Sequence, residues 1–195
     1  MIDKTTNCFI HFPATFLHSH WYEERPNVLE LELKSLEEFK GTYNHPLFDY
    51  YPTITDDGTL SVAIRLPIKI TSSSPWEVWI LDMRFLDNHA LYKQENDGLF
   101  GGSIRIYPDS RHKLAGDGSF EVPIIKTYHH FVRENGNPNG PYYMCQLESA
   151  EDYEINARRA LDQAIRWIAN YITWESTGID VDGEFARSSS GGGFI

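Results

Sequence analysis

The feature that most constrains the fold is a strict alternation of apolar and polar residues that starts just after Gly58. The apolar positions are Leu60, Val62, Ile64, Leu66, Ile68 and Ile70. A period of two places these side chains on one face of a β-strand, so the pattern predicts a strand with one buried face. Pro67 has no N–H to donate to a neighbouring strand, which predicts that this strand lies at an edge or is interrupted there.

Three later segments also have the character of strands. Residues 77–86 alternate in the same way, residues 103–107 end at Pro108, and residues 120–128 contain Pro123. Consecutive strands with short or moderate links are typical of an antiparallel meander. The sequence therefore predicts a four-stranded antiparallel meander.

The clearest helical signal follows these strands. Apolar residues recur at helical spacing at Ala157, Ala160, Leu161, Ala164, Ile165, Ile168 and Ile172. Ser149 is a candidate N-cap and Gly178 a candidate end of this helix. Residues 28–39 mix both periods and predict a strand or a short helix that stops before Gly41. The predicted fold class is therefore α+β, with flanking helices packed against one sheet.

The charge balance excludes two classes of partner. The 195 residues include 17 Lys and Arg against 28 Asp and Glu, a net charge of −11. A nucleic-acid-binding protein needs a basic face, and an anionic membrane repels an acidic protein. We therefore predict neither nucleic acid nor membrane as a partner. No apolar run approaches the roughly 20 residues that span a bilayer, and the start of the chain does not resemble a signal peptide, so the predicted location is cytoplasmic.

Cys145 is the strongest candidate for a reactive residue. It follows a turn-rich stretch and precedes the predicted helix, and loops on a rigid scaffold commonly carry function. A lone intracellular cysteine is more often a small buried hydrophobe. His129 and His130 precede it by about sixteen positions, and a Cys–His couple would pair a nucleophile with a base. Because no third orienting group is evident, a structural role is favoured for each histidine.

Two other polar groups have both a chemical and a structural explanation. The first, near the N-terminus, consists of Cys8, His11, His18 and His20. Their spacing matches no common zinc pattern, so packing at the domain edge is favoured and neither a metal nor another cofactor is predicted. The second group, Asn135, Asn137 and Asn139, suits turns. A carboxamide from this group could also donate a hydrogen bond to an oxyanion that forms near Cys145.

The stretch from residue 102 to residue 185 resembles a ubiquitin-conjugating enzyme. The resemblance is carried by IRIYP at 104–108 (third strand and proline turn), FEVPIIKTYH at 120–129 (fourth strand and motif histidine) and YMCQL at 143–147 (strand with the active cysteine). The helix with Trp167 and the segment 178–185 are similar to the bacterial branch of that family. Members of that branch sit beside activating-enzyme-like and deconjugase-like proteins in antiphage operons.

The resemblance implies a UBC-like fold and an activity. Cys145 would accept the C-terminus of a ubiquitin-like protein from an activating enzyme, hold it as a thioester and pass it to an amine of a target protein. His129 would hold the loop as a structural residue. Asn137 would serve the oxyanion, and Asp152 would orient or deprotonate the incoming amine. As in the bacterial branch, this transferase would act in antiphage defence.

The sequence departs from the family pattern at the motif. His130 and Phe131 stand where the family has proline and asparagine, so its oxyanion residue has no direct counterpart here. The alternatives for the two roles are Asn135, Asn137 or Asn139 for the oxyanion, and Glu148, Glu151 or Asp152 for the amine. Two rival hypotheses remain: a catalytically inactive UBC-like module that binds a ubiquitin-like or activating-enzyme partner, and an unrelated α+β scaffold in which Cys145 is core.

The predicted organisation is one domain with two additions. Residues 1–58 form an N-terminal extension packed on the core, and residues 59–187 form the UBC-like core domain. Residues 188–195, rich in serine and glycine, form a flexible tail.

Overall fold

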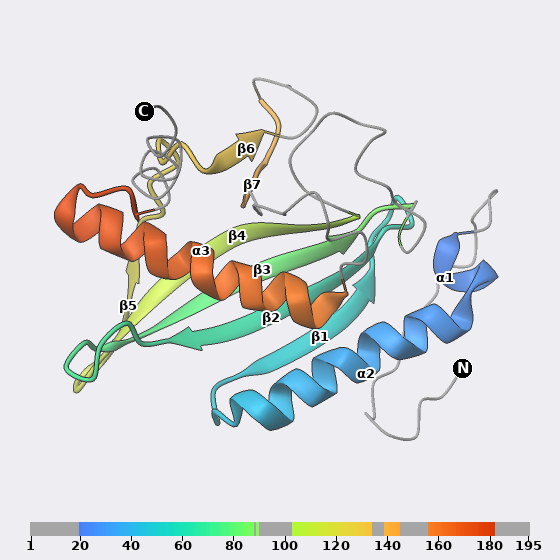
Figure 1. The fold of residues 1–195 in the computed structure, drawn as a ribbon, viewed down its shortest axis with the longest axis horizontal. Coiled ribbons are helices and arrows are strands. Elements are labelled where there is room, and N and C mark those ends of the chain that lie inside the picture. Colours follow the sequence, from blue (N-terminus) through green and yellow to red (C-terminus); the bar gives the residue numbers. More distant parts are fainter. Residues whose placement is uncertain (1–19, 88, 90–102, 134–138, 145–155, 182–195) are drawn as a thin grey trace, which may run out of the picture.

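The computed structural model describes residues 20–87, 89, 103–133, 139–144 and 156–181 (Figure 1). Its elements are α1 (Trp21–Glu24), α2 (Pro26–Tyr43), β1 (Asp49–Ile54), β2 (Leu60–Ile68), β3 (Trp76–Phe85), β4 (Ile104–Ala115), β5 (Gly118–Val122), β6 (Phe131–Arg133), β7 (Tyr142–Met144) and α3 (Ala157–Thr177). The predicted α+β class is confirmed.

The strands form one main sheet and one small hairpin. The sheet is antiparallel with the order β1-β2-β3-β4-β5, so each strand pairs with the next one in sequence, and β6 pairs with β7 separately. In Figure 1, α3 crosses in front of the sheet and α2 runs along its β1 edge. Buried side chains of both helices share one core with those of the first four strands, so both helices cover the same apolar face.

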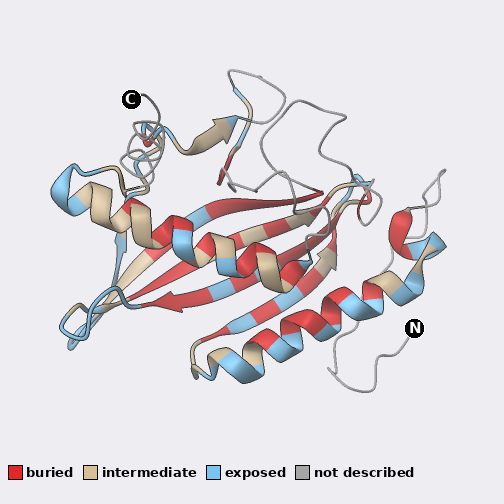
Figure 2. Cartoon of the chain, in the orientation of Figure 1, coloured by how far each residue is buried: buried red, intermediate tan, exposed pale blue. Residues whose placement is uncertain are grey.

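The alternation in β2 gives the buried face that the sequence predicts. The predicted apolar positions within β2 are all 4% exposed or less, whereas Ala63 and Arg65 are exposed (Figure 2). Ile70, the last position of the alternation, lies beyond β2 and is 36% exposed. Pro67 lies beyond Arg65, the last residue of β2 that pairs with β1, and is still opposite Val78 of β3. Because β2 lies between β1 and β3, the prediction of an edge strand is wrong. The proline is tolerated because the pairing with β1 already ends at Arg65, so the missing N–H interrupts no pairing on that side.

The sheet has five strands and not the four that the sequence predicts. The additional strand is β1, whose buried positions are Tyr50, Pro52 and Ile54. A proline is tolerated in β1 because this strand lies at the edge of the sheet, but it weakens the local strand signal. β1 belongs to the segment 1–58 and pairs with β2, while the division of the chain at residue 58 stays a prediction.

The segment with mixed periods is a helix, and it is longer than predicted. α2 starts with Pro26, which suits the first helical position, and continues through Gly41. Its buried apolar residues are Leu29, Leu33, Leu36 and Phe39. The helix ends at Tyr43, and its C-cap residue, Asn44, has a φ of 45°, in the left-handed region that is common at helix ends.

Two strands end elsewhere than the sequence predicts. β4 passes through Pro108, and its register against β3 shifts between Ile80 and Leu81. This bulge takes up an extra residue, so a proline fits without breaking the strand. The strand expected over 120–128 is shorter and ends before Pro123.

The apolar stripe of α3 is confirmed. Ala157, Ala160, Leu161, Ala164 and Ile168 are fully buried. The N-cap is Asn156, whose side chain accepts a hydrogen bond from the backbone N–H of Arg159 at 2.9 Å. The predicted cap, Ser149, lies outside the described residues and is not the cap of this helix. Gly178 ends α3 with a φ of 73°, which favours glycine.

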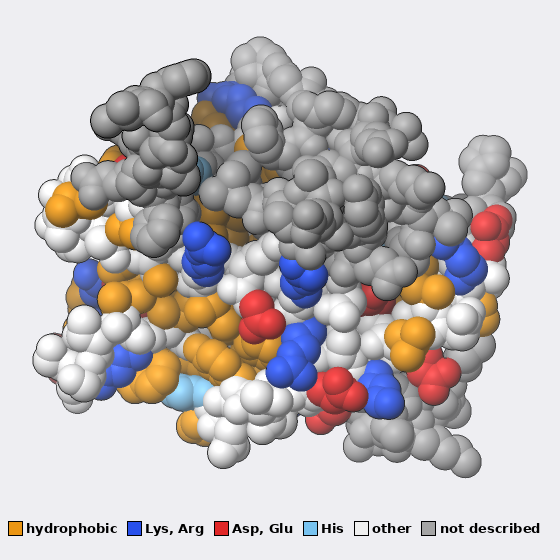
Figure 3. All heavy atoms as spheres, in the orientation of Figure 1, with side chains coloured by type: hydrophobic (Ala, Val, Ile, Leu, Met, Phe, Trp, Pro, Cys, Tyr) orange, Lys and Arg blue, Asp and Glu red, His pale blue; other side chains and the backbone are white. Residues whose placement is uncertain are grey.

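Apolar side chains also reach the surface on the face that the helices cover. In Figure 3 they gather on the left, the side on which α3 ends and β5 lies. Phe120 of β5 is 54% exposed and Ile179, just after α3, is 48% exposed. Exposed apolar side chains are normal in globular proteins, so these residues receive no functional assignment.

A buried carboxylate joins the two long helices. Glu32 of α2 is 6% exposed, and its Oε2 accepts a hydrogen bond of 2.6 Å from the backbone N–H of Ala157 at the start of α3. Its Oε1 lies 3.1 Å from Nε2 of His89, and Nδ1 of His89 lies 2.8 Å from Oγ of Ser103. The carboxylate therefore satisfies a helix N–H that has no partner within the helix, and its charge suits the positive end of the helix dipole.

We expect the replacement Glu32→Ala to lower the free energy of unfolding by about 3 kcal/mol, because it leaves a helix N–H and a buried imidazole without their acceptor. Glu30→Ala is the matched control: Glu30 is exposed on the same helix, and its loss should change stability by less than about 0.5 kcal/mol. Urea denaturation of the three proteins measures both values. Equal effects of the two replacements would contradict the role assigned to Glu32.

Candidate functional site

The segment between β5 and β6 leads to the two adjacent histidines and is held by β4 and α3. Nε of Arg111 donates a hydrogen bond to the backbone oxygen of Pro123 at 3.1 Å. The backbone N–H of Ile125 donates to the phenol oxygen of Tyr171 at 2.6 Å. Burial raises the pKa of Tyr171, so the phenol stays protonated at neutral pH. These contacts fix where the segment starts.

Arg111 is the electrostatic anchor under this segment. Its side chain is fully buried and pairs with Glu175 of α3, while a second carboxylate, Glu77, lies 3.6 Å away. The guanidinium also lies 5.5 Å from the ring centre of Trp79 and 5.2 Å from that of Tyr171. A planar cation that faces carboxylates and aromatic rings tolerates burial better than an isolated charge. Arg111 therefore ties β4 to the end of α3.

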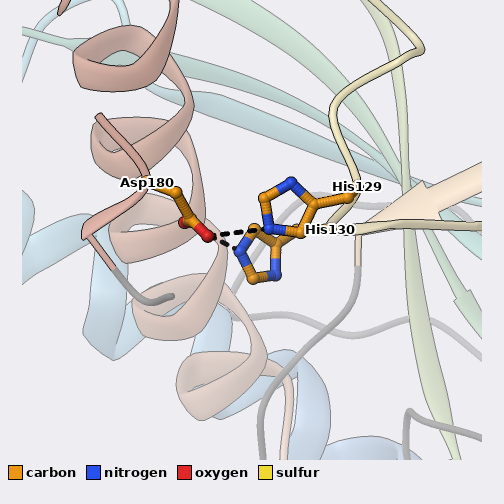
Figure 4. Close-up of side chains that lie close together, drawn as sticks. All are labelled: His129, His130 and Asp180. Atoms are coloured by element: carbon orange, nitrogen blue, oxygen red, sulfur yellow. Dashed lines mark hydrogen bonds and ion pairs between the residues drawn. The ribbon is translucent and has the colours of Figure 1, made fainter. Parts of the chain in front are cut away.

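The two histidines converge on one carboxylate after α3. Nε2 of His129 lies 2.8 Å from Oδ2 of Asp180, and Nε2 of His130 lies 3.1 Å from Oδ1 of the same residue (Figure 4). The imidazole ring centres are 4.1 Å apart. Nε1 of Trp167 donates a 3.0 Å hydrogen bond to the backbone oxygen of His130, and the ring of Tyr128 contacts both imidazoles.

This group is open on one side. The side chain of His129 is 57% exposed, whereas those of His130 and Asp180 are 15% and 18% exposed. As N–H donors, both imidazoles donate hydrogen bonds to the carboxylate, stabilise its charge and hold the segment to the chain after α3. With their nitrogen lone pairs turned toward Asp180, they are instead two metal ligands beside a third. The three ligand atoms lie within 4.8 Å of one another.

The hairpin of β6 and β7 connects this group with the end of β7. Phe131 of β6 pairs with Met144 of β7 in an antiparallel register. β6 begins one residue after His130, and β7 ends one residue before Cys145. The pairing therefore brings the end of β7 back to the histidine segment from which the hairpin starts.

Most of the predicted site residues fall outside the part of the chain that is described. Cys145, Asn137 and Asp152 lie outside it, and so their predicted roles stay predictions. His129 is described, and its partner is Asp180. No sequence signal singles out Asp180, because it lies just after the end of α3 and about fifty residues from the histidines.

Of the three histidines near the N-terminus, only His20 is among the described residues. His11 and His18 lie outside the described ranges together with Cys8. The ring of His20 stacks on Tyr22 with centres 5.3 Å apart, and Nδ1 of His20 lies 3.6 Å from a carboxylate oxygen of Asp87. His20 thus packs against the domain.

Comparisons with protein-family models, with curated proteins and with solved structures found no match to this chain. Among the described residues, no helix is long and apolar enough to cross a membrane.

We expect Arg111→Met to lower the free energy of unfolding by about 3 kcal/mol, because it removes the cation that faces the buried carboxylate of Glu77 and the partly buried one of Glu175. Lys113, 3.5 Å from Glu77, compensates only part of this loss. Arg65→Met is the matched control, since Arg65 is exposed on β2 and its replacement should change stability by less than about 0.5 kcal/mol. Guanidinium denaturation compares the two variants with the parent. A loss for Arg111→Met no larger than that for the control would refute the anchoring role.

Proposed function

We propose that this chain is a thioester carrier of the ubiquitin-conjugating type, with Cys145 as its nucleophile. The observation that carries the proposal is the pairing of Phe131 with Met144. It places the end of β7, and so the residue directly before Cys145, beside the segment that contains His129 and His130. A nucleophile next to a rigidly held polar segment is what acyl transfer requires.

The order of the elements supports the same proposal. A helix (α2) is followed by antiparallel strands that pair in sequence order, a loop with a histidine, a short strand that ends before a cysteine, and a helix across the sheet. This is the order expected for a UBC-like fold, with a fifth strand in the sheet and with β6 between the histidines and the short strand β7. On this basis we also propose that the fold is UBC-like.

The reaction is two acyl transfers. The Cys145 thiolate attacks the activated carbonyl carbon at the C-terminus of a ubiquitin-like protein, and the group supplied by the activating enzyme leaves as the thioester forms. An amine of the target then attacks the thioester carbonyl, loses a proton and forms an amide, while the thiolate leaves. An unperturbed cysteine is a few per cent thiolate at about pH 7, so positioning is the main contribution of the protein.

Other residues have positioning roles in this scheme. His129 holds the loop through its contact with Asp180 and is not the general base. Asn137 donates to the oxyanion, and Asp152 orients the incoming amine. The reaction needs a reduced thiol, so we place it in the cytoplasm. Its partners are an activating enzyme and a ubiquitin-like modifier, and we propose that it acts in antiphage defence.

One observation favours a second candidate, a binding module without catalysis. Phe131 stands where the family has its oxyanion asparagine, and its ring packs on Trp167 with centres 4.7 Å apart and on Tyr142 at 5.9 Å. The side chain of Phe131 is therefore a packing group and cannot donate a hydrogen bond to an oxyanion. A module of this kind would bind the same partners and form no thioester.

The test is incubation of the protein with ATP, an activating-enzyme-like protein and a ubiquitin-like protein of the kind that the proposal requires. We expect an adduct on a non-reducing gel that thiol reductant removes, lost in Cys145→Ala and retained in the matched control Cys8→Ala. An adduct that persists in Cys145→Ala would refute the assignment of the nucleophile. No adduct, together with a Cys145 that resists alkylation in the folded protein, would overturn catalysis in favour of the binding module.

A further inference from the structure

Two imidazole nitrogens and a carboxylate converge at one point of the surface. The contacts run from Nε2 of His129 and Nε2 of His130 to the two oxygens of Asp180, at 2.8 and 3.1 Å (Figure 4). Within the described ranges, this is the only group of three or more His, Cys, Asp or Glu side chains whose ligand atoms could all reach one ion. Their donor set, two nitrogens and one oxygen, is one that zinc and its neighbours accept.

The spacing of the ligand atoms fits a small divalent cation. Bonds of about 2.0–2.1 Å at a tetrahedral angle separate two ligand atoms by about 3.3 Å. The two observed N···O contacts, each to a different oxygen of Asp180, are 2.8 and 3.1 Å, and the ligand atoms all lie within 4.8 Å of one another. Small shifts of these side chains therefore bring the two nitrogens and one oxygen to this spacing. Because the side chain of His129 is 57% exposed, its ring has room to make this adjustment. Each imidazole then carries its proton on Nδ1, which turns the lone pair of Nε2 toward the ion.

The electrostatic surroundings favour a cation at this place. Asp180 follows the C-terminal end of α3, where the dipole of a 21-residue helix presents partial negative charge. The last turn of α3 contains no basic residue of its own, and Arg111, which reaches it from β4, is already paired with Glu175. The chain as a whole carries a net charge of −11. A bound cation therefore meets attraction from the carboxylate, the helix end and the net charge.

The imidazoles are also held in place by neighbouring groups. Nε1 of Trp167 donates to the backbone oxygen of His130, and the ring centre of Tyr128 lies 5.3 Å and 5.0 Å from those of the two imidazoles. Outer groups of this kind orient metal ligands before the metal arrives. The site is thus built on a packed segment and a helix end, and of its three side chains only that of His129 is largely exposed.

We propose that His129, His130 and Asp180 bind one zinc-class divalent cation through the two Nε2 atoms and a carboxylate oxygen. Three protein ligands leave a coordination position for water or an exogenous ligand, and the exposed side of His129 gives access to it. The ion would join the segment before β6 to the chain after α3. The proposal is independent of thioester formation, because it involves no thiol.

The experiment uses the full chain, stripped of metal, in which Cys8 and Cys145 are both replaced by serine. Zinc titration by calorimetry should give one site per chain. Cobalt(II) should give a visible spectrum of nitrogen and oxygen coordination without a thiolate charge-transfer band. Zinc should also raise the melting temperature. The absence of heat, spectrum and thermal shift under excess metal would overturn the proposal.

Variants in this background locate the site. Asp180→Asn keeps the side-chain shape, and we expect it and His130→Ala to raise the Kd for zinc more than about 100-fold, beyond what loss of an outer group costs. The matched control is His112→Gln, because His112 lies on β4 beside Ser110 and should leave the Kd unchanged. If Asp180→Asn, shown to be folded by its near-UV circular dichroism, binds zinc as tightly as the control, the ion is held elsewhere and the proposal fails.

Discussion

The carboxylate of Glu32 on α2 contacts both the start of α3 and His89, which lies between β3 and β4. A glutamate on the apolar side of a helix is unfavourable unless its charge is compensated, and here the start of α3 supplies an N–H and a positive dipole end. The imidazole of His89 takes the other oxygen. The position of α3 over the sheet depends on this contact, and the candidate site depends on α3.

α3 organises the candidate site from its other end. Trp167, Tyr171 and Glu175 all lie on this helix, and each holds a different part of the chain: the His130 backbone, the Ile125 backbone and the buried guanidinium of Arg111, respectively. Asp180 then follows the helix cap and meets both histidines. One helix thus fixes the whole segment between β5 and β6. The hairpin that follows brings the end of β7 to the same place.

Local patterns predict the elements in which near neighbours decide the structure. The buried faces of β2 and α3 follow from their periods of two and of about 3.6 residues, and Gly178 ends α3 as expected. The prediction fails where a proline obscures a pattern. β1 tolerates Pro52 at the sheet edge, and β4 passes Pro108 through a bulge, since in both places a neighbouring strand rather than the local sequence decides the pairing.

The sequence by itself determined the α+β class, the most regular strand and helix, and the pair His129–His130 as residues of interest. Only the tertiary structure decided that Asp180 is their partner, that Glu32 accepts a hydrogen bond from the first residue of α3 and that Phe131 lies opposite Met144. The physical reason is the range of the forces involved. Periodicity records which face of an element avoids water, whereas hydrogen bonds between distant residues depend on which faces meet after the chain has folded.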